Sequence, residues 1–165
     1  MFTGGQMRDH SIRGAGRQVL LQLTRTVGMS ILVAVSDDDD FKIVLTVAMR
    51  LAAGLDQDLQ VTHVTGEKSA SQRERAFRDD VRAFLSEANM PVDINLEHLD
   101  RGGLRSGTAI GKQLLELAED VDIDHIVIGH HSKNRLRTAS QGHTDFIVAE
   151  AAAVPVTIVP ESVEL

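Results

Sequence analysis

Residues 124–144 read DHIVIGHHSKNRLRTASQGHT, a short apolar run followed by a polar and basic loop. The run 125–128 has the length and composition of a strand that is buried on both faces of a sheet. Gly129 ends this run, and Gly142 precedes the next helical pattern. A strand, a glycine-bounded loop and a helix start can present backbone N–H groups and the positive end of a helix dipole to an anion. The stretch therefore predicts an anion site after a central strand.

Outward from this stretch, strand and helix patterns alternate along the chain. Strands are expected at 31–35, 59–65, 92–96, 125–128 and 156–159, with helical spacing in each interval. Such alternation predicts an α/β fold with a parallel sheet and helices on both faces. The first and fourth strands are the most uniformly apolar, which favours a three-layer α/β/α, Rossmann-like or flavodoxin-like sheet of order 3-2-1-4-5. The ligand crevice of this fold lies where strands 1 and 4 diverge.

Local signals predict where the helices begin and end. Asp38 to Asp40 place acids in the first turn of the first helix, and Gly54 suits its C′ position. Ser71 and Glu74 have the spacing of a capping box before the second helix. Thr108 is expected to cap the third helix, and the fourth spans 144–153.

Composition limits the class of protein. The 165 residues carry a formal net charge of −7, include no cysteine, tryptophan or tyrosine, and contain no apolar stretch long enough for a membrane span. Disulfides and thiol chemistry are thereby excluded, and nucleic acid and membrane partners are not expected. We expect a cytoplasmic protein with one domain at 29–160. Residues 1–28, with four arginines and one aspartate, are interpreted as a flexible or non-native tail, and 161–165 as a C-terminal tail.

The glycine loop resembles the signature of the universal stress protein family: Gly, two residues, Gly, nine residues, Gly, then Ser or Thr. Here the pattern reads Gly129, two histidines, Ser132, nine residues, Gly142 and His143. Ser132 and His143 depart from the family residues, and Thr144 follows one position later. The resemblance covers about residues 29–160 and implies the parallel fold described above.

The resemblance also implies a site for ATP or AMP, with or without magnesium. The strand-1 loop supplies an acid near the ligand, the end of strand 2 a valine near adenine, and the strand-4 loop holds phosphates. Carried over by position, the nucleotide-binding residues are Ser36, Asp37, Val64, Gly129, Ser132, Gly142, His143 and Thr144. The loop adds three cations as phosphate contacts: Lys133, Arg135 and Arg137.

Three functional hypotheses remain open. The first is a regulatory nucleotide-binding protein with at most slow ATP hydrolysis, since no catalytic residue is recognisable. The second is a dimeric interaction module of the same fold that has no nucleotide and acts through an unknown protein partner. The third is a small hydrolase or electron-transfer domain. No metal site is assigned, because His130, His131 and His143 have no carboxylate in their loop before Asp145.

The last strand predicts a homodimer. Residues 156–159 are short, apolar and uncharged, and a strand of that kind at a sheet edge is prone to association. Members of the family commonly dimerise through this strand, which implies Val156 and Ile158 as contact residues. Pro155 and Pro160 bracket the strand and limit how far pairing extends.

Overall fold

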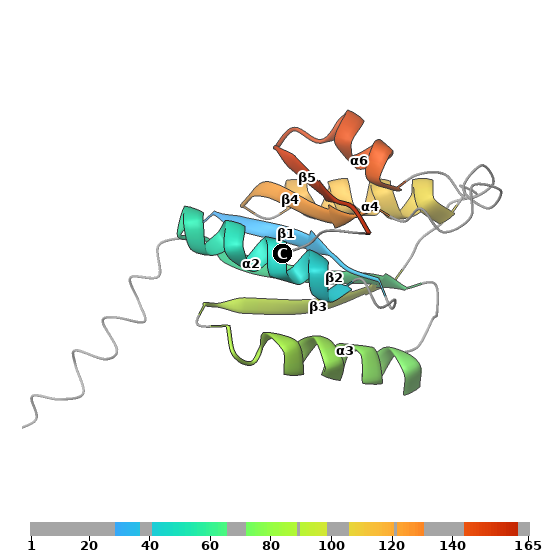
Figure 1. Cartoon of the computed structure of the whole chain (residues 1–165). Helices are drawn as coiled ribbons and strands as arrows, with labels where there is room; N and C mark the ends of the chain where they lie inside the picture. The colour runs from blue at the N-terminus through green and yellow to red at the C-terminus, as the bar shows by residue number, and fades with distance from the viewer. Residues whose placement is uncertain are drawn as a thin grey trace, which may run out of the picture.

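The protein is a three-layer α/β/α sandwich around one parallel sheet (Figure 1). A computed structural model describes residues 29–36, 41–65, 72–88, 90–98, 106–120, 122–130 and 144–161. Its elements are β1 Ser30–Ala34, α2 Phe41–Leu55, β2 Asp58–Thr65, α3 Gln72–Leu85, β3 Val92–His98, α4 Ser106–Asp120, β4 Ile123–Gly129, α6 Thr144–Ala151 and β5 Val156–Val159.

The five strands are parallel and lie in the order β3-β2-β1-β4-β5. The predicted fold class and strand order are therefore confirmed. β1 and β4 lie in the middle, where Val33 pairs in register with Val61 on one side and with Val127 on the other. All three valines are buried, as a strand covered on both faces requires.

Two apolar clusters, one on each face, hold the layers together (Figure 1). The helices α2 and α3 cover the face that carries the larger cluster, and α4 and α6 cover the other. Fully buried side chains that represent the two clusters are Ile31, Leu45, Leu59 and Val81 on the first face, and Leu32, Leu114, Ile126 and Val148 on the second.

The helix ends differ from the sequence-based expectation in two places. α2 is described from Phe41 onward, and Asp38 to Asp40, expected in its first turn, lie outside the described residues. Gly54 lies inside α2 rather than at C′. Asp56 takes the left-handed conformation there, with φ 56°, and the N–H of Gln57 donates to the carbonyl of Ala52 at 3.0 Å. Aspartate tolerates this conformation better than most residues, and the long hydrogen bond closes the helix as a Schellman motif does.

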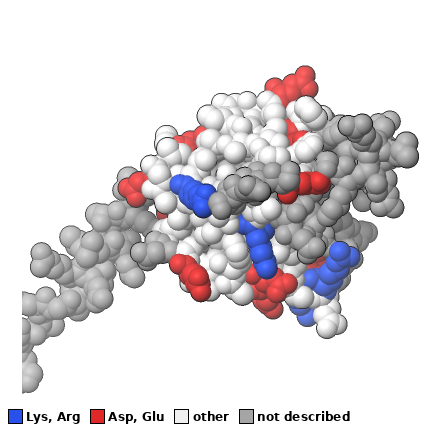
Figure 2. Space-filling model, in the orientation of Figure 1, with Lys and Arg blue, Asp and Glu red and all other residues white. Residues whose placement is uncertain are grey.

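The second difference concerns α4, which begins at Ser106, so Thr108 lies within its first turn rather than at its cap. On the face shown in Figure 2, charged side chains lie separately among uncharged areas, and the coloured residues form no continuous basic surface. None of the helices in the described ranges is long and apolar enough to span a bilayer.

Candidate functional site

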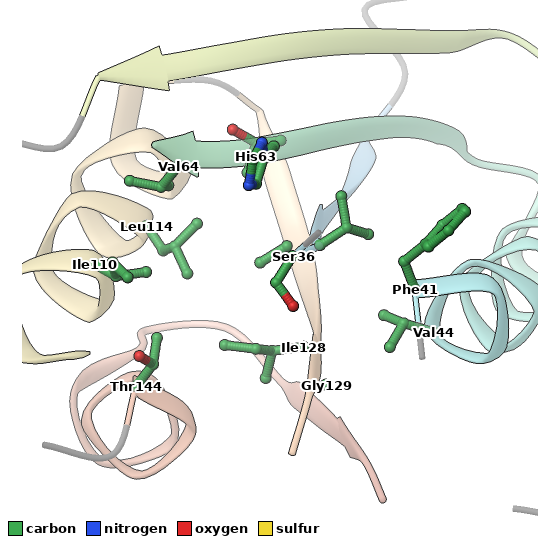
Figure 3. A pocket seen from close by; sticks show the side chains of 13 residues that line it. Ser36, Phe41, Val44, His63, Val64, Ile110, Leu114, Ile128, Gly129 and Thr144 are labelled. Carbon is green, nitrogen blue, oxygen red and sulfur yellow. The ribbon is translucent and has the colours of Figure 1, made fainter. Parts of the chain in front are cut away.

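A pocket of ≈ 110 Å³ lies at the carboxyl ends of β1, β2 and β4. In Figure 3, Ile110, Leu114 and Thr144 form one side of it, and Phe41 and Val44 form the other. Its volume is several times the roughly 10–15 Å³ that a single water needs. After β1 the chain continues to β2 on one side, and after β4 it continues to β5 on the other side. The carboxyl ends of β1 and β4 therefore form the switch point where open α/β sheets bind ligands.

Four of the residues assigned from sequence line this pocket. Ser36 follows β1, Val64 is near the end of β2, Gly129 ends β4 and Thr144 begins α6 (Figure 3). The remaining assigned residues lie outside the described part of the chain: Asp37, Ser132, Lys133, Arg135, Arg137, Gly142 and His143.

The walls of the pocket are mainly apolar. Its apolar lining side chains are Ala34, Val35, Phe41, Val44, Val64, Ile110, Leu114 and Ile128. No lysine, arginine, aspartate or glutamate is among the described residues that line it. A concave, apolar surface with a few polar groups is suited to a flat ring system that is oriented by hydrogen bonds.

Thr62 is the most deeply buried polar residue in the wall, with 2% of its surface exposed. Its carbonyl accepts a hydrogen bond from the N–H of Val35 at 3.0 Å, which ties β2 to the end of β1. Its side-chain Oγ1 has no hydrogen-bond partner among the described residues. A buried hydroxyl in this state carries a desolvation cost.

His63 connects the pocket to helix α3. Its Nδ1 lies 3.0 Å from Glu74 Oε2, and both side chains are nearly buried. Its ring meets that of Phe77 edge-on, with centroids 4.7 Å apart, and Phe77 in turn packs edge-on against Phe41 at 5.3 Å. The aromatic contacts couple the pocket wall to the start of α2 and to the second turn of α3.

A second histidine and carboxylate join β4 to α6. His130 follows Gly129, and its backbone N–H donates to the carbonyl of Val159 at 2.7 Å. Its Nδ1 lies 2.5 Å from Oδ2 of Asp145, in the first turn of α6. Because a carboxylate only accepts, the ring nitrogen is the donor. Asp145 is buried, and the side chain of His130 is 34% exposed.

Thr144, which starts α6, has its hydroxyl committed to a different helix. Oγ1 donates to the carbonyl of Gly107 in the first turn of α4 at 3.1 Å. This contact fixes the spacing between the two helices that bound one side of the pocket.

Sequence reasoning did not assign Phe41, Thr62 or Asp145 to the site. Phe41 lines the pocket, and Asp145 contacts His130 next to the lining residue Gly129, and only the folded chain creates these contacts. No sequence signal distinguished Thr62, because β2 also contains the polar residues Asp58, Gln60, His63 and Thr65. The described residues contain no group of three or more His, Asp or Glu side chains placed to hold a metal ion.

Strand order, helix layers and a pocket at the switch point define a doubly wound, flavodoxin-like α/β fold. The family model of the universal stress protein family matches residues 29–160. The chain therefore belongs to the universal stress protein family.

Solved structures show the same fold at low sequence identity. A universal stress protein from Archaeoglobus fulgidus is 20% identical, with 79% of this chain and 98% of that chain covered and a TM-score of 0.60. A universal stress protein in complex with cAMP is 16% identical, with 82% and 98% covered and a TM-score of 0.65. The Archaeoglobus fulgidus protein in complex with dAMP is 20% identical, with 81% and 98% covered and a TM-score of 0.59. No protein of curated function matched the chain.

Proposed function

We propose that this chain is a regulatory universal stress protein that binds an adenine nucleotide, AMP or ATP, in the pocket between β1 and β4. The observation that carries the proposal is the meeting of Ser36, Val64, Gly129 and Thr144, which come from four separate elements, around one pocket. Two structurally similar proteins were solved with cAMP and with dAMP, and both ligands contain adenine.

The described lining suits such a ligand. Apolar walls between Val64, Leu114 and Phe41 offer van der Waals contact to a purine ring. Sugar and phosphate would lie toward Gly129 and the start of α6. We expect at most slow ATP hydrolysis, because the described lining includes no carboxylate to act as a general base.

Isothermal calorimetry with AMP and with ATP, each with and without magnesium, tests the proposal. Val64→Trp places an indole in the pocket and is expected to abolish the binding heat while the circular dichroism spectrum stays unchanged. Leu55→Trp is the matched control, since Leu55 is 53% exposed at the C-terminal end of α2, whereas Phe41, which lines the pocket, is at its N-terminal end. Full AMP binding by Val64→Trp would place the ligand elsewhere.

A second function, a dimeric interaction module, is favoured by the outer edge of β5. This four-residue strand pairs with β4 on one side. Ile158 is 37% exposed although it is a large apolar residue of the sheet. We infer a homodimer through Val156 and Ile158, with nucleotide acting on the dimer or its partners. A stable dimer that gives no binding heat with AMP or ATP would favour the interaction module alone.

A further inference from the structure

A groove lies between α2 and α3, the two helices that cover one face of the sheet (Figure 1). Its volume is ≈ 790 Å³, and its apolar lining residues are Phe41, Met49, Ala83, Phe84 and Ala88. Met49 and Phe84 are only partly buried, although both pack against the core cluster of this face. The groove therefore leaves part of an apolar cluster open to a further apolar surface.

The charged residues along the groove are mainly acidic. Asp80 in α3 and Glu87 after its end both line the groove, and both are exposed. They are seven residues apart, which is roughly two helical turns. Lys42 is the one basic residue among the described residues that line the groove. An amphipathic helix with cations about two turns apart would complement a surface of this kind.

The chain itself contains a segment with these properties. Residues 17–27 lie outside the described residues and read RQVLLQLTRTV. The apolar positions 19, 20, 23 and 27 have the spacing of one face of an amphipathic helix. Arg17 and Arg25 are eight residues apart, also roughly two helical turns, and the segment contains no acid. Its charge is therefore opposite to that of Asp80 and Glu87.

This segment joins the described fold close to the groove. It is followed by Gly28 and Met29, and Ser30 at the start of β1 pairs with Asp58, three residues after the end of α2 at Leu55. Met49 lies six residues before Leu55, about 9 Å along the helix axis. Eleven helical residues span about 16 Å, so residues 17–27 are long enough to lie along the groove.

The surface between the two is apolar as well. Met29 is 60% exposed and Leu55 is 53% exposed, and both are large apolar residues at the end of the sheet where the segment joins β1. A segment that turned from β1 toward the groove would cover exposed apolar surface at this end.

We propose that residues 17–27 of the same chain occupy the groove between α2 and α3. The apolar face of the segment packs on Met49 and Phe84, and its two arginines lie near Asp80 and Glu87. This inference gives the segment a role that the interpretation of residues 1–28 as a flexible or non-native tail does not. It does not depend on nucleotide binding.

A spin label attached to the full chain tests the proposal. The sequence contains no cysteine, so Gln22→Cys provides a single attachment point outside the apolar face of the segment. Amide signals of Ala83 and Phe84 in the groove are expected to lose most of their height, relative to the same sample after the label is reduced. Signals of Lys112 and Glu116 in α4, which covers the opposite face, should keep their height.

Leu23→Asp places a charge on the apolar face of the segment and is expected to restore the signals of Ala83 and Phe84. Leu21→Asp is the matched control, because the same substitution falls outside that face, and the signal loss should persist. On the groove side, Glu87→Lys should also restore the signals, whereas Glu116→Lys on the opposite face should not.

Full signal height at Ala83 and Phe84 in the labelled protein would overturn the proposal, and so would equal effects of Leu23→Asp and Leu21→Asp. A mixture of labelled protein with unlabelled, isotope-enriched protein identifies the source of the segment. No signal loss in the unlabelled copy is expected. A loss at Ala83 there would show that the segment of a second copy enters the groove, which would overturn the assignment to the same chain.

Discussion

Among single residues, Thr62 shows most directly how the pocket differs from an ordinary core. Its neighbours in β2, Val61 and Leu59, are buried apolar residues, and Thr62 is as inaccessible as they are. Its hydroxyl has no partner among the described residues. A buried polar group that is left unpaired costs stability.

Thr62→Val is therefore expected to stabilise the ligand-free protein and to weaken binding. Removing an unpartnered buried hydroxyl should raise the free energy of unfolding by about 1 kcal/mol, and such a change raises Tm by about 2–4 °C in a chain of this size. The affinity for adenosine should fall at the same time. Thermal unfolding and calorimetry on one preparation measure the two effects.

Thr157→Val provides the control, since the same substitution in β5 removes a hydroxyl that lies 2.9 Å from His125 Nε2. Loss of that hydrogen bond should lower the free energy of unfolding by about 1 kcal/mol. If Thr62→Val destabilises the protein as much as Thr157→Val does, the Thr62 hydroxyl has a partner in solution and is not available to a ligand.

The sequence predicted the backbone positions of the site better than its side chains. Ser36 and Gly129 follow from one topological rule, because the carboxyl ends of parallel strands meet at one edge. Val64 and Thr144 were carried over from the family resemblance. The His130–Asp145 contact spans 15 positions and depends on how α6 docks. No periodicity encodes such a pairing, so only the folded chain identifies it.

Between helices, the close approach of α4 and α6 depends on Gly111. A Cβ at this position would lie 2.8 Å from Cγ2 and 3.0 Å from Cβ of Ile147, both closer than packed carbons tolerate. Ile147 is β-branched and cannot turn aside easily. The glycine thus allows the close approach of the two helices that border the pocket. The Thr144 hydroxyl in α6 donates to the carbonyl of Gly107 in α4 across the same interface.

Gly111→Ala is expected to destabilise the protein despite the better helix propensity of alanine. Overpacking costs about 1–3 kcal/mol, and the gain in propensity offsets at most about 1 kcal/mol. Gly54→Ala in α2 is the matched control, because a Cβ there meets nothing within 4 Å, and it should stabilise by up to about 1 kcal/mol. Urea unfolding measures both. An equal change in the free energy of unfolding in the two variants would show that α4 and α6 do not pack closely in solution.

The order of the elements followed from sequence because strand and helix patterns have different periods. Helix ends were less predictable. Gly54 is the residue type usually found at C′, but the helix continues to Leu55. It ends at Asp56, which adopts the left-handed conformation. A second residue type that tolerates the same backbone angles was enough to move the end of the helix.

For the molecule taken as a unit, the two edges of the sheet differ. β3 forms one edge and carries Asp93 and Glu97, whose charges discourage further pairing. β5 forms the other edge with four residues, none of them charged. Self-association is therefore expected at β5 rather than at β3.

Ile158→Asp is expected to convert a homodimer into a monomer. When two β5 strands pair across a two-fold axis, an aspartate on the exposed part of each strand would lose water and would lie near the same aspartate of the other protomer. Light scattering coupled to gel filtration at micromolar concentration measures the mass. Leu55→Asp is the matched control, because it introduces the same charge at an exposed apolar residue away from the sheet edge, and it should remain dimeric. A monomeric wild-type protein, or a dimer that survives Ile158→Asp, would rule out this interface.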